Sequence, residues 1–295
     1  MMHYPDYPFT SHFIKIQDHK LHYLDEGEKH AEPVVMLHGN PSWSFYYRKL
    51  LTGLKDQYRC IVPDHIGMGL SDKPSKDKYD FHFLQRVKDL TEFLNLLGIN
   101  KKITLVVHDW GGMIGMLYAS QNPGRVKRLV ILNTGAFHLP KDKPLPLSIR
   151  LGRTPIVNSL LVQGLNAFCK GAVKYCVTNA MDPNVSSAYL APYDNWHNRL
   201  AVKKFVEDIP LETHDRGYAD ISNIDHTNPA LQSIPKLLCW GMQDFVFDNT
   251  FLREWQNLYP DADVHQFDNA GHYVLEDAAD KIIPLVRKFL EANPI

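Results

Sequence analysis

One segment, LVVHDWGG at residues 105–112, constrains the fold of this chain more than any other. Its apolar first half ends a predicted strand, Ile103–Val107, and its two glycines open a predicted helix that runs to about Gln121. Asp109 lies at the sharp turn between them. Such a turn holds its central residue exposed above the end of a sheet, and it needs glycine because the following helix packs closely. Asp109 is therefore a predicted nucleophile, although an aspartate here can also serve only as a helix cap.

Short apolar runs recur along the chain and predict eight strands. They are His12–Ile16, Lys20–Leu24, Pro33–Leu37, Tyr58–Pro63, Ile103–Val107, Val126–Leu132, Pro235–Trp240 and 263–267. Helical segments, such as Phe83–Leu97 and those near 249–259 and 277–291, separate most of the strands. This alternation predicts a mostly parallel sheet covered on both faces. The first two runs are close together and predict an antiparallel hairpin at the sheet edge.

The alternation of predicted strands and helices is interrupted between residues 137 and 229. This stretch opens with the loop-like HLPKDKPLPL and continues with helix-like segments around 155–180 and 184–206. No buried strand is predicted in it. We therefore expect a core domain of residues 1–136 and 230–295, with a helical cap of residues 137–229 inserted after the sixth strand.

Charge, hydropathy and cysteine spacing exclude several classes of function. The 32 basic and 33 acidic residues nearly balance, so binding of nucleic acid or of an anionic membrane through bulk charge is not expected. No apolar run approaches the roughly 20 residues that span a bilayer, and MMHYPDYPFTSHF lacks the features of a signal peptide. None of the four cysteines forms a C-x-x-C pair, which argues against zinc or redox chemistry. We expect a cytoplasmic enzyme that needs no metal and no organic cofactor.

Two further motifs supply partners for Asp109. His272, in DNAGHY, follows the last predicted strand, and Asp244, in WGMQD, follows the seventh. Nucleophile, acid and histidine in this order match a catalytic triad in which the acid orients the histidine and stabilises its charged form. Asp248 lies close to Asp244 and is the rival for the role of the acid.

The loop HGNPSW after the third predicted strand contains Asn40, and Trp110 follows the nucleophile directly. Both side chains carry an N–H donor and no charge. Converging beside Asp109, they would bind a departing anion such as a halide. An Asx turn for Asn40 and core packing for Trp110 are the structural alternatives.

Taken together, HGNPSW, HDWGG, DHIGMGLSDKP at residues 64–74, and GHY at 271–273 resemble the haloalkane dehalogenases of the α/β-hydrolase superfamily. The resemblance covers the chain from about residue 10. It implies an α/β-hydrolase fold with Asp109 as nucleophile, His272 as base and Asp244 as orienting acid. It also implies that Asn40 and Trp110 stabilise the halide. An acid after strand seven combined with asparagine as the second donor is similar to the third dehalogenase subfamily.

Parts of the predicted cap are similar to a second group, the β-lactone decarboxylases of bacterial long-chain olefin synthesis. The segments are AFHLP at 136–140, LAPYD at 190–194 and FVEDIPL at 205–211. The resemblance implies the same catalytic residues for both reactions, so these residues do not separate them. We expect hydrolysis of haloalkanes through an alkyl-aspartate ester, with β-lactone decarboxylation as the alternative. The expected partners are a small apolar substrate and halide, and a homo-oligomer stays open by analogy with the subfamily.

Two other hypotheses are weaker. Epoxide hydrolysis also uses an HDWGG elbow and would need lid tyrosines, of which Tyr175, Tyr189 and Tyr193 are the candidates, but Asn40 stands where an aromatic residue is usual. A catalytically silent binding protein is opposed by the intact set of nucleophile, acid and base. The apolar candidates for lining the substrate pocket are Phe45, Phe137, Leu139, Leu165, Phe168 and Phe247.

Overall fold

The computed structural model of the chain describes residues 4–99, 102–122, 124–140, 143 and 153–295. Its centre is an eight-stranded sheet with the order β1-β2-β4-β3-β5-β6-β7-β8. The strands are β1 His12–Ile16, β2 His19–Glu26, β3 Pro33–Leu37, β4 Arg59–Pro63, β5 Ile103–His108, β6 Val126–Leu132, β7 Lys236–Gly241 and β8 Asp263–Phe267. Strands β3 to β8 pair in parallel, whereas β2 is antiparallel to both β1 and β4. The predicted α/β fold and the edge hairpin are confirmed.

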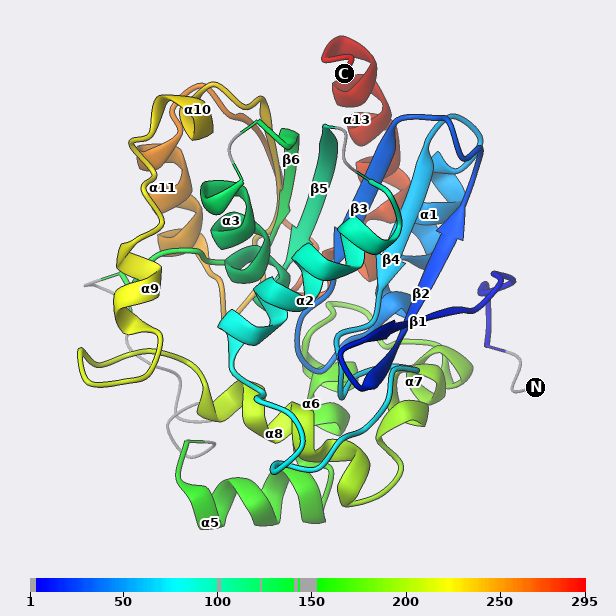
Figure 1. Cartoon of the computed structure of the whole chain (residues 1–295), viewed down its shortest axis with the longest axis vertical. Coiled ribbons are helices and arrows are strands. Elements are labelled where there is room, and N and C mark those ends of the chain that lie inside the picture. The colour runs from blue at the N-terminus through cyan, green and yellow to red at the C-terminus, as the bar shows by residue number, and fades with distance from the viewer. Residues whose placement is uncertain (1–3, 100–101, 123, 141–142, 144–152) are drawn as a thin grey trace.

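Helices cover both faces of this sheet. Helices α2 and α3 lie in front of the strands and α1 and α13 behind them (Figure 1). The helices outside the insertion are α1 Arg48–Leu54, α2 Phe83–Leu96, α3 Trp110–Gln121, α11 Asn249–Leu258, α12 Val274–Asp277 and α13 Ala279–Ala292, with the 3-10 turn η1 at Ser44–Tyr47. The helix expected near 277–291 is α13, and the short α12 that precedes it is separate because Ala278 leaves the helical region (φ −138°, ψ 23°).

The central strands are mostly apolar because both of their faces are covered. Every residue of β5 and of β7 is buried, although β7 begins with a lysine. A strand covered on both faces reads as a continuous apolar run rather than as an alternating one. This continuous run is why the central strands could be recognised in the sequence. Polar residues gather at the carboxyl ends of these strands.

Between β6 and β7 the described residues form helices and turns and no strand. They are α5 Pro155–Asn158, the π-helix η2 Ser159–Gly164, α6 Ala167–Tyr175, α7 Pro183–Leu190, the 3-10 turns η3 Ala191–Tyr193 and η4 His197–Arg199, α8 Leu200–Glu207, α9 Tyr218–Ser222 and α10 Pro229–Gln232. Helices α5 to α8 gather at one end of the sheet (Figure 1). The two long helical segments predicted here are broken, for instance at Asn166, whose positive φ of 53° interrupts the backbone hydrogen bonding. The cap boundaries at 137 and 229 stay a prediction.

No helix in the described part of the chain combines the length and the apolar character that crossing a bilayer requires.

Candidate active site

Asp109 lies between β5 and α3 in a strained conformation, with φ 51° and ψ −126°. A residue other than glycine held in this region costs free energy, and such strain concentrates at functional sites. The surrounding backbone leaves no room for larger neighbours. A Cβ on Gly39 would lie 2.0 Å from Asp109 Oδ1, and one on Gly111 would lie 2.0 Å from the carbonyl oxygen of Leu37. The glycines predicted for the turn are therefore required by close backbone approach.

Backbone donors hold the carboxylate of Asp109. The N–H of Asn40 donates to Oδ1 at 2.6 Å, and the N–H of Trp110 also donates to the carboxylate. Burial raises the pKa of Asp109 above its usual value of 3.8, and the nearby His272 and the two N–H groups only partly oppose this rise. The result is a poorly hydrated carboxylate in a fixed orientation, the state in which a carboxylate is most reactive as a nucleophile.

His272 lies between two carboxylates. Its Nε2 is 3.7 Å from Asp109 Oδ2, and its Nδ1 is 2.8 Å from Asp244 Oδ2. Burial lowers the pKa of His272, but the negative charges of Asp244 and Asp109 outweigh it, so that the pKa is raised above 6.5. The contact with Asp244 indicates that Nδ1 carries a proton and that Nε2 is directed to Asp109.

The carboxylate of Asp244 is itself held by three further donors. Oδ1 accepts the backbone N–H groups of Val246 at 2.7 Å and Phe247 at 3.1 Å, and Oδ2 accepts Asn133 Nδ2 at 3.0 Å. Asn133 Nδ2 also donates to the carbonyl oxygen of Gly241, and Asn133 Oδ1 accepts the N–H of Gly241. Sequence reasoning missed Asn133 as a positioning residue. It directly follows β6, and its amide carries no charge that would mark it in the sequence as a partner of the triad.

Asp248 occupies a different environment. Its Oδ1 accepts the N–H of Thr250 at 2.9 Å and so caps helix α11, while Oδ2 pairs with Lys143 at 2.7 Å. The structure thus brings Asp244 to His272 and leaves the predicted rival at the start of a helix.

Asp64 is a second residue whose contribution sequence reasoning missed. Its buried carboxylate accepts the N–H groups of Ser44 at 2.6 Å and Leu70 at 2.8 Å and contacts His22 at 2.8 Å. It therefore joins the loop that contains Asn40 to the loop after β4. The sequence signal was the DHIGMG segment, which had been used only for its family resemblance.

A cavity of about 730 Å³ lies over Asp109, and Asn40, Trp110 and His272 form part of its wall. Most of the lining is apolar. Of the six predicted lining residues, Phe137, Leu139, Phe168 and Phe247 do line it. The prediction is wrong for two. Phe45 is buried elsewhere, with Arg48 over its ring at 4.1 Å, and Leu165 is 57% exposed in the turn between η2 and α6.

The two predicted side-chain donors differ in their surroundings. Asn40 Nδ2 donates to the carbonyl oxygen of Val202, in α8, at 3.1 Å. An amide has two N–H bonds, so one remains for a ligand. The ring of Trp110 packs against Phe205 at 5.2 Å, and within the described residues nothing accepts a hydrogen bond from its indole N–H.

Comparison with known proteins agrees with the fold described above. The family model for the alpha/beta hydrolase fold matches residues 32–155 and 161–279, which is most of the chain. The chain belongs to the α/β-hydrolase family.

Two relatives of this α/β-hydrolase cover nearly its whole length. The cis-3-alkyl-4-alkyloxetan-2-one decarboxylase of Shewanella oneidensis is 51% identical and covers 96% of this chain and 89% of its own. A haloalkane dehalogenase of Mycolicibacterium paratuberculosis is 40% identical and covers 97% of this chain and 94% of its own. Both groups named by resemblance are thus among the homologues, and the decarboxylase shares more residues with this α/β-hydrolase.

Solved structures support the fold of this α/β-hydrolase. The crystal structure of the haloalkane dehalogenase DbeA from Bradyrhizobium elkani superposes with a TM-score of 0.85 at 24% identity, over 96% of this chain and 99% of that one. At this identity the likeness concerns the fold alone.

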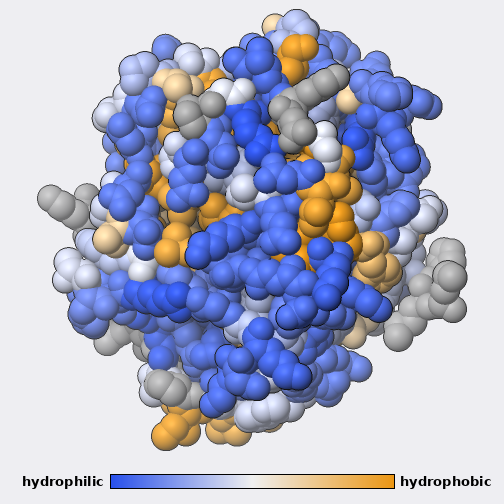
Figure 2. All heavy atoms as spheres, in the orientation of Figure 1, coloured by the Kyte–Doolittle hydropathy of each residue, from blue (hydrophilic) through white to orange (hydrophobic). Residues whose placement is uncertain are grey.

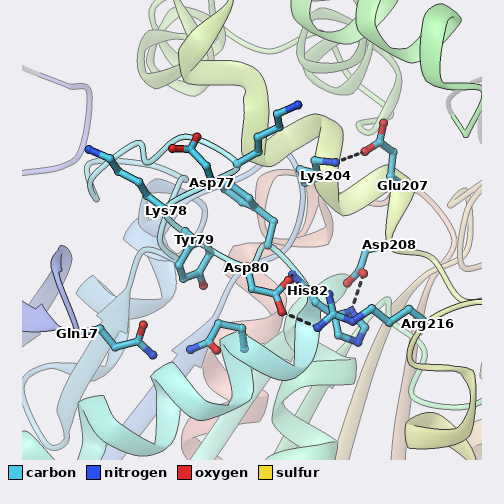
Figure 3. Close-up of a pocket in the computed structure, with 13 residues that line it drawn as sticks. Gln17, Asp77, Lys78, Tyr79, Asp80, His82, Lys204, Glu207, Asp208 and Arg216 are labelled. Atoms are coloured by element: carbon cyan, nitrogen blue, oxygen red, sulfur yellow. Dashed lines mark hydrogen bonds and ion pairs between the residues drawn. The ribbon is translucent and has the colours of Figure 1, made fainter.

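A second hollow of about 680 Å³ in this α/β-hydrolase is polar (Figure 3). Charged side chains of both signs line it, and several of them pair with each other. Asp208, at the end of α8, contacts His82 at 2.6 Å, and Arg216 forms an ion pair with Asp80 (Figure 3). These contacts join the loop before α2 to the insertion. We therefore interpret the hollow as part of the contact between the loop before α2 and the insertion, and not as a reaction site.

Proposed function

We propose that this α/β-hydrolase is a β-lactone decarboxylase that converts cis-3-alkyl-4-alkyloxetan-2-ones to alkenes and carbon dioxide. The observation that carries the proposal is its 51% identity, over 96% of the chain, to an enzyme of that name. The dehalogenase is less similar, at 40%. Sequence analysis put dehalogenation first and decarboxylation second, and the comparisons favour the second. The apolar cavity over Asp109 suits alkyl chains.

In the proposed first step, Asp109 attacks the saturated ring carbon that carries the lactone oxygen. A new C–O bond forms an alkyl ester of Asp109, and the strained ring C–O bond breaks, leaving its electron pair on a carboxylate. Oδ1 accepts the N–H of Asn40, so Oδ2, which is 3.7 Å from His272, is the attacking oxygen.

In the second step, the new carboxylate leaves as carbon dioxide. The bond that joined it to the neighbouring ring carbon breaks, and this electron pair forms the carbon–carbon double bond as the ester C–O bond to Asp109 breaks. The electron pair of that C–O bond returns to Asp109 and restores the free carboxylate. One lactone gives one alkene and one carbon dioxide, and neither water nor a proton is consumed.

His272 and the side-chain donors act on the charge that develops. Burial lowers the pKa of His272, but Asp244 and Asp109 raise it further than burial lowers it, so the protonated imidazole is more populated than in free histidine at the same pH. A positive charge beside the opening ring, together with N–H groups of Asn40 and Trp110, stabilises the emerging carboxylate. Asp244 holds the ring of His272 and offsets its charge.

Haloalkane dehalogenation is the second candidate, and the free indole N–H of Trp110 beside the cavity favours it. Here Asp109 displaces halide from carbon, and His272 in its neutral form removes a proton from water, which hydrolyses the ester to the alcohol. The same residues serve, but His272 must be deprotonated.

Epoxide hydrolysis receives less support. The hydroxyl of Tyr189 donates to Glu276, and that of Tyr193 donates to the carbonyl oxygen of Ser42. Of the three lid tyrosines considered, Tyr175 alone lines the cavity. A pair of tyrosines to protonate an epoxide oxygen is therefore not assembled by these residues.

A paired product assay on the purified enzyme tests the proposal. One arm offers a cis-3,4-dialkyl oxetan-2-one and measures alkene and carbon dioxide, and the other offers 1-bromohexane and 1,2-dibromoethane and measures halide. We expect fast alkene formation with slow or no halide release. Halide release without alkene would replace the proposal with the dehalogenase.

A further inference from the structure

The cap carries an apolar surface patch that the reaction does not use. We define the cap patch as five side chains that are each between 54% and 82% exposed: Ile156, Leu160, Leu165, Tyr175 and Trp196. Figure 2 shows apolar side chains at the foot of the molecule, where Figure 1 places α5. Exposed apolar patches of this kind mark contact surfaces in soluble proteins.

The members of the cap patch lie on connected elements. Helix α5 runs directly into η2, so Ile156 and Leu160 are one helical turn apart. A Cβ on Gly164 would lie 3.6 Å from the ring of Trp196 and 3.8 Å from Leu160, so both side chains lie beside Gly164. Ile156, Leu160 and Trp196 are therefore near one another on the cap, and Leu165 follows Gly164 directly in the chain.

The same elements form the wall of the active-site cavity. Leu161 and Val162 of η2 and Phe168 of α6 line it, next to members of the cap patch along the chain. Tyr175 belongs to both the patch and the lining, and Phe245, which is 47% exposed, lines the cavity as well. Apolar side chains thus extend from the exposed face of the cap to the lining of the cavity that contains Asp109.

The segment that carries four of the five members of the cap patch has only basic charged residues, whereas the fifth member, Trp196, lies two residues after the exposed Asp194. Residues 153–181 contain Arg153, Lys170 and Lys174 and no acidic residue. Arg153 pairs with Asp215, but Lys170 and Lys174 are exposed on α6 and make no ion pair with any described residue. Exposed apolar side chains flanked by lysines are the features of a surface that lies in the headgroup region of an anionic bilayer.

We propose that the cap patch docks on an anionic lipid surface, so that apolar substrate passes between the bilayer and the cavity without crossing water. The net charge of −1 gives the whole molecule no attraction to such a surface, and the contact is therefore local. The inference rests on the apolar cavity and not on which reaction Asp109 performs.

Vesicle binding tests the docking directly. Purified enzyme is sedimented with vesicles of phosphatidylcholine and with vesicles of equimolar phosphatidylcholine and phosphatidylglycerol. We expect binding to the anionic vesicles, and a weaker interaction with the neutral ones. Trp196 supplies a second readout because it is 54% exposed, whereas the other four tryptophans are buried. Its emission should shift to shorter wavelength on the anionic vesicles, and the shift should be lost in Trp196→Tyr.

Variants separate docking from folding and from catalysis. Ile156→Ser/Leu160→Ser should weaken vesicle binding about ten-fold or more, and so should Lys170→Gln/Lys174→Gln. Leu96→Ser, a change in α2 at a site that is also 54% exposed, is the matched control and should bind like the parent enzyme. Asp109→Asn should still bind, so that a failure of the proposed reaction leaves this result intact.

Three outcomes would overturn the proposal. They are no sedimentation of the parent enzyme with anionic vesicles, unchanged binding of both double variants, and a fall in oligomeric mass in Ile156→Ser/Leu160→Ser without a change in vesicle binding. The last result would assign the patch to a second copy of the chain.

Discussion

At the scale of single residues, the candidate site depends on one carboxylate held away from water. Asp109 is strained, buried and bonded by two backbone N–H groups. Because burial raises its pKa, the folded chain binds this proton more tightly than the unfolded chain does, so the ionised carboxylate costs stability as the pH rises above 3.8. Asp109 therefore does not contribute to the stability of the fold at neutral pH.

Replacing Asp109 with asparagine should remove turnover without unfolding the protein. An amide is not a nucleophile here, so we expect product formation to fall by about three orders of magnitude or more. The melting temperature at neutral pH should stay unchanged or rise, because a buried charge is removed. Asp248→Asn is the matched control. Asparagine also caps helices, and the activity should stay close to that of the parent enzyme. A larger loss in the control than in Asp109→Asn would point to the wrong carboxylate.

The pH dependence distinguishes the two candidate reactions through His272, whose pKa is raised above 6.5. If decarboxylation uses the protonated imidazole, kcat/KM should decline as the pH rises through this pKa. If dehalogenation uses the neutral imidazole as a base, the rate should decline as the pH falls through it. In both cases Asp109 must be ionised, which adds a loss of rate on the acid side, at a pH above 3.8. Alkene formation that increases steadily with pH would contradict the role given to His272.

At the scale of secondary-structure elements, the insertion is attached to the core by its helix ends. Helix α2 has no capping side chain of its own, and Asp208, at the end of α8, accepts the N–H of Phe83 at 2.7 Å. In α8, the carbonyl oxygen of Val202 accepts a hydrogen bond from Asn40, and the ring of Phe205 packs on Trp110. The position of α8 thus sets one wall of the cavity.

Replacing Asp208 with alanine should therefore affect both stability and activity. Loss of the cap of α2 and of the contact with His82 should lower the free energy of unfolding by about 1–3 kcal/mol in a denaturant titration. Turnover should also fall, because α8 loses an anchor next to Asn40. Glu207→Ala is the control. Glu207 pairs with Lys203 and Lys204 on its own helix, so its loss should cost about 0.5 kcal/mol or less. Equal effects of the two variants would show that α8 is held by other contacts.

At the scale of the whole molecule, the cavity is enclosed by the core on one side and the insertion on the other. Gly171, in α6, lines the cavity, and a Cβ added there would meet no atom within 4 Å. The glycine therefore leaves free space for an alkyl chain, although glycine inside a helix disfavours the helix.

Filling this space should shorten the chains that the enzyme accepts. Gly171→Leu should raise KM for long-chain substrates about ten-fold or more, and should leave short-chain substrates nearly unaffected. The variant should also be somewhat more stable, by up to about 1 kcal/mol, since leucine favours the helix. Gly171→Ala gives a similar gain in helix propensity with less added volume, so its KM should change little. Equal KM values for all chain lengths would place the substrate elsewhere in the cavity.

The α/β fold could be predicted from the sequence alone, as could the order of its strands along the chain and the elbow at Asp109. Each of these depends on local patterns. Buried strands read as apolar runs, and a strained turn needs glycine at particular positions. The residues after strands five, seven and eight could be singled out because the carboxyl ends of parallel strands meet at one edge of the sheet.

The contacts between groups in the site follow from the three-dimensional packing of the chain. Asp244 and Asp248 are four residues apart, and their different roles follow from the direction that each side chain takes, which a sequence pattern does not record. Asn133 supports Asp244 from another strand, and Asp208 caps a helix more than a hundred residues earlier. The positions of Phe45 outside the cavity and of Leu165 on the surface depend on how the insertion packs. Contacts between residues distant in the chain are made when whole elements pack and form hydrogen bonds. They cannot be predicted from the local propensity of a segment for helix or strand.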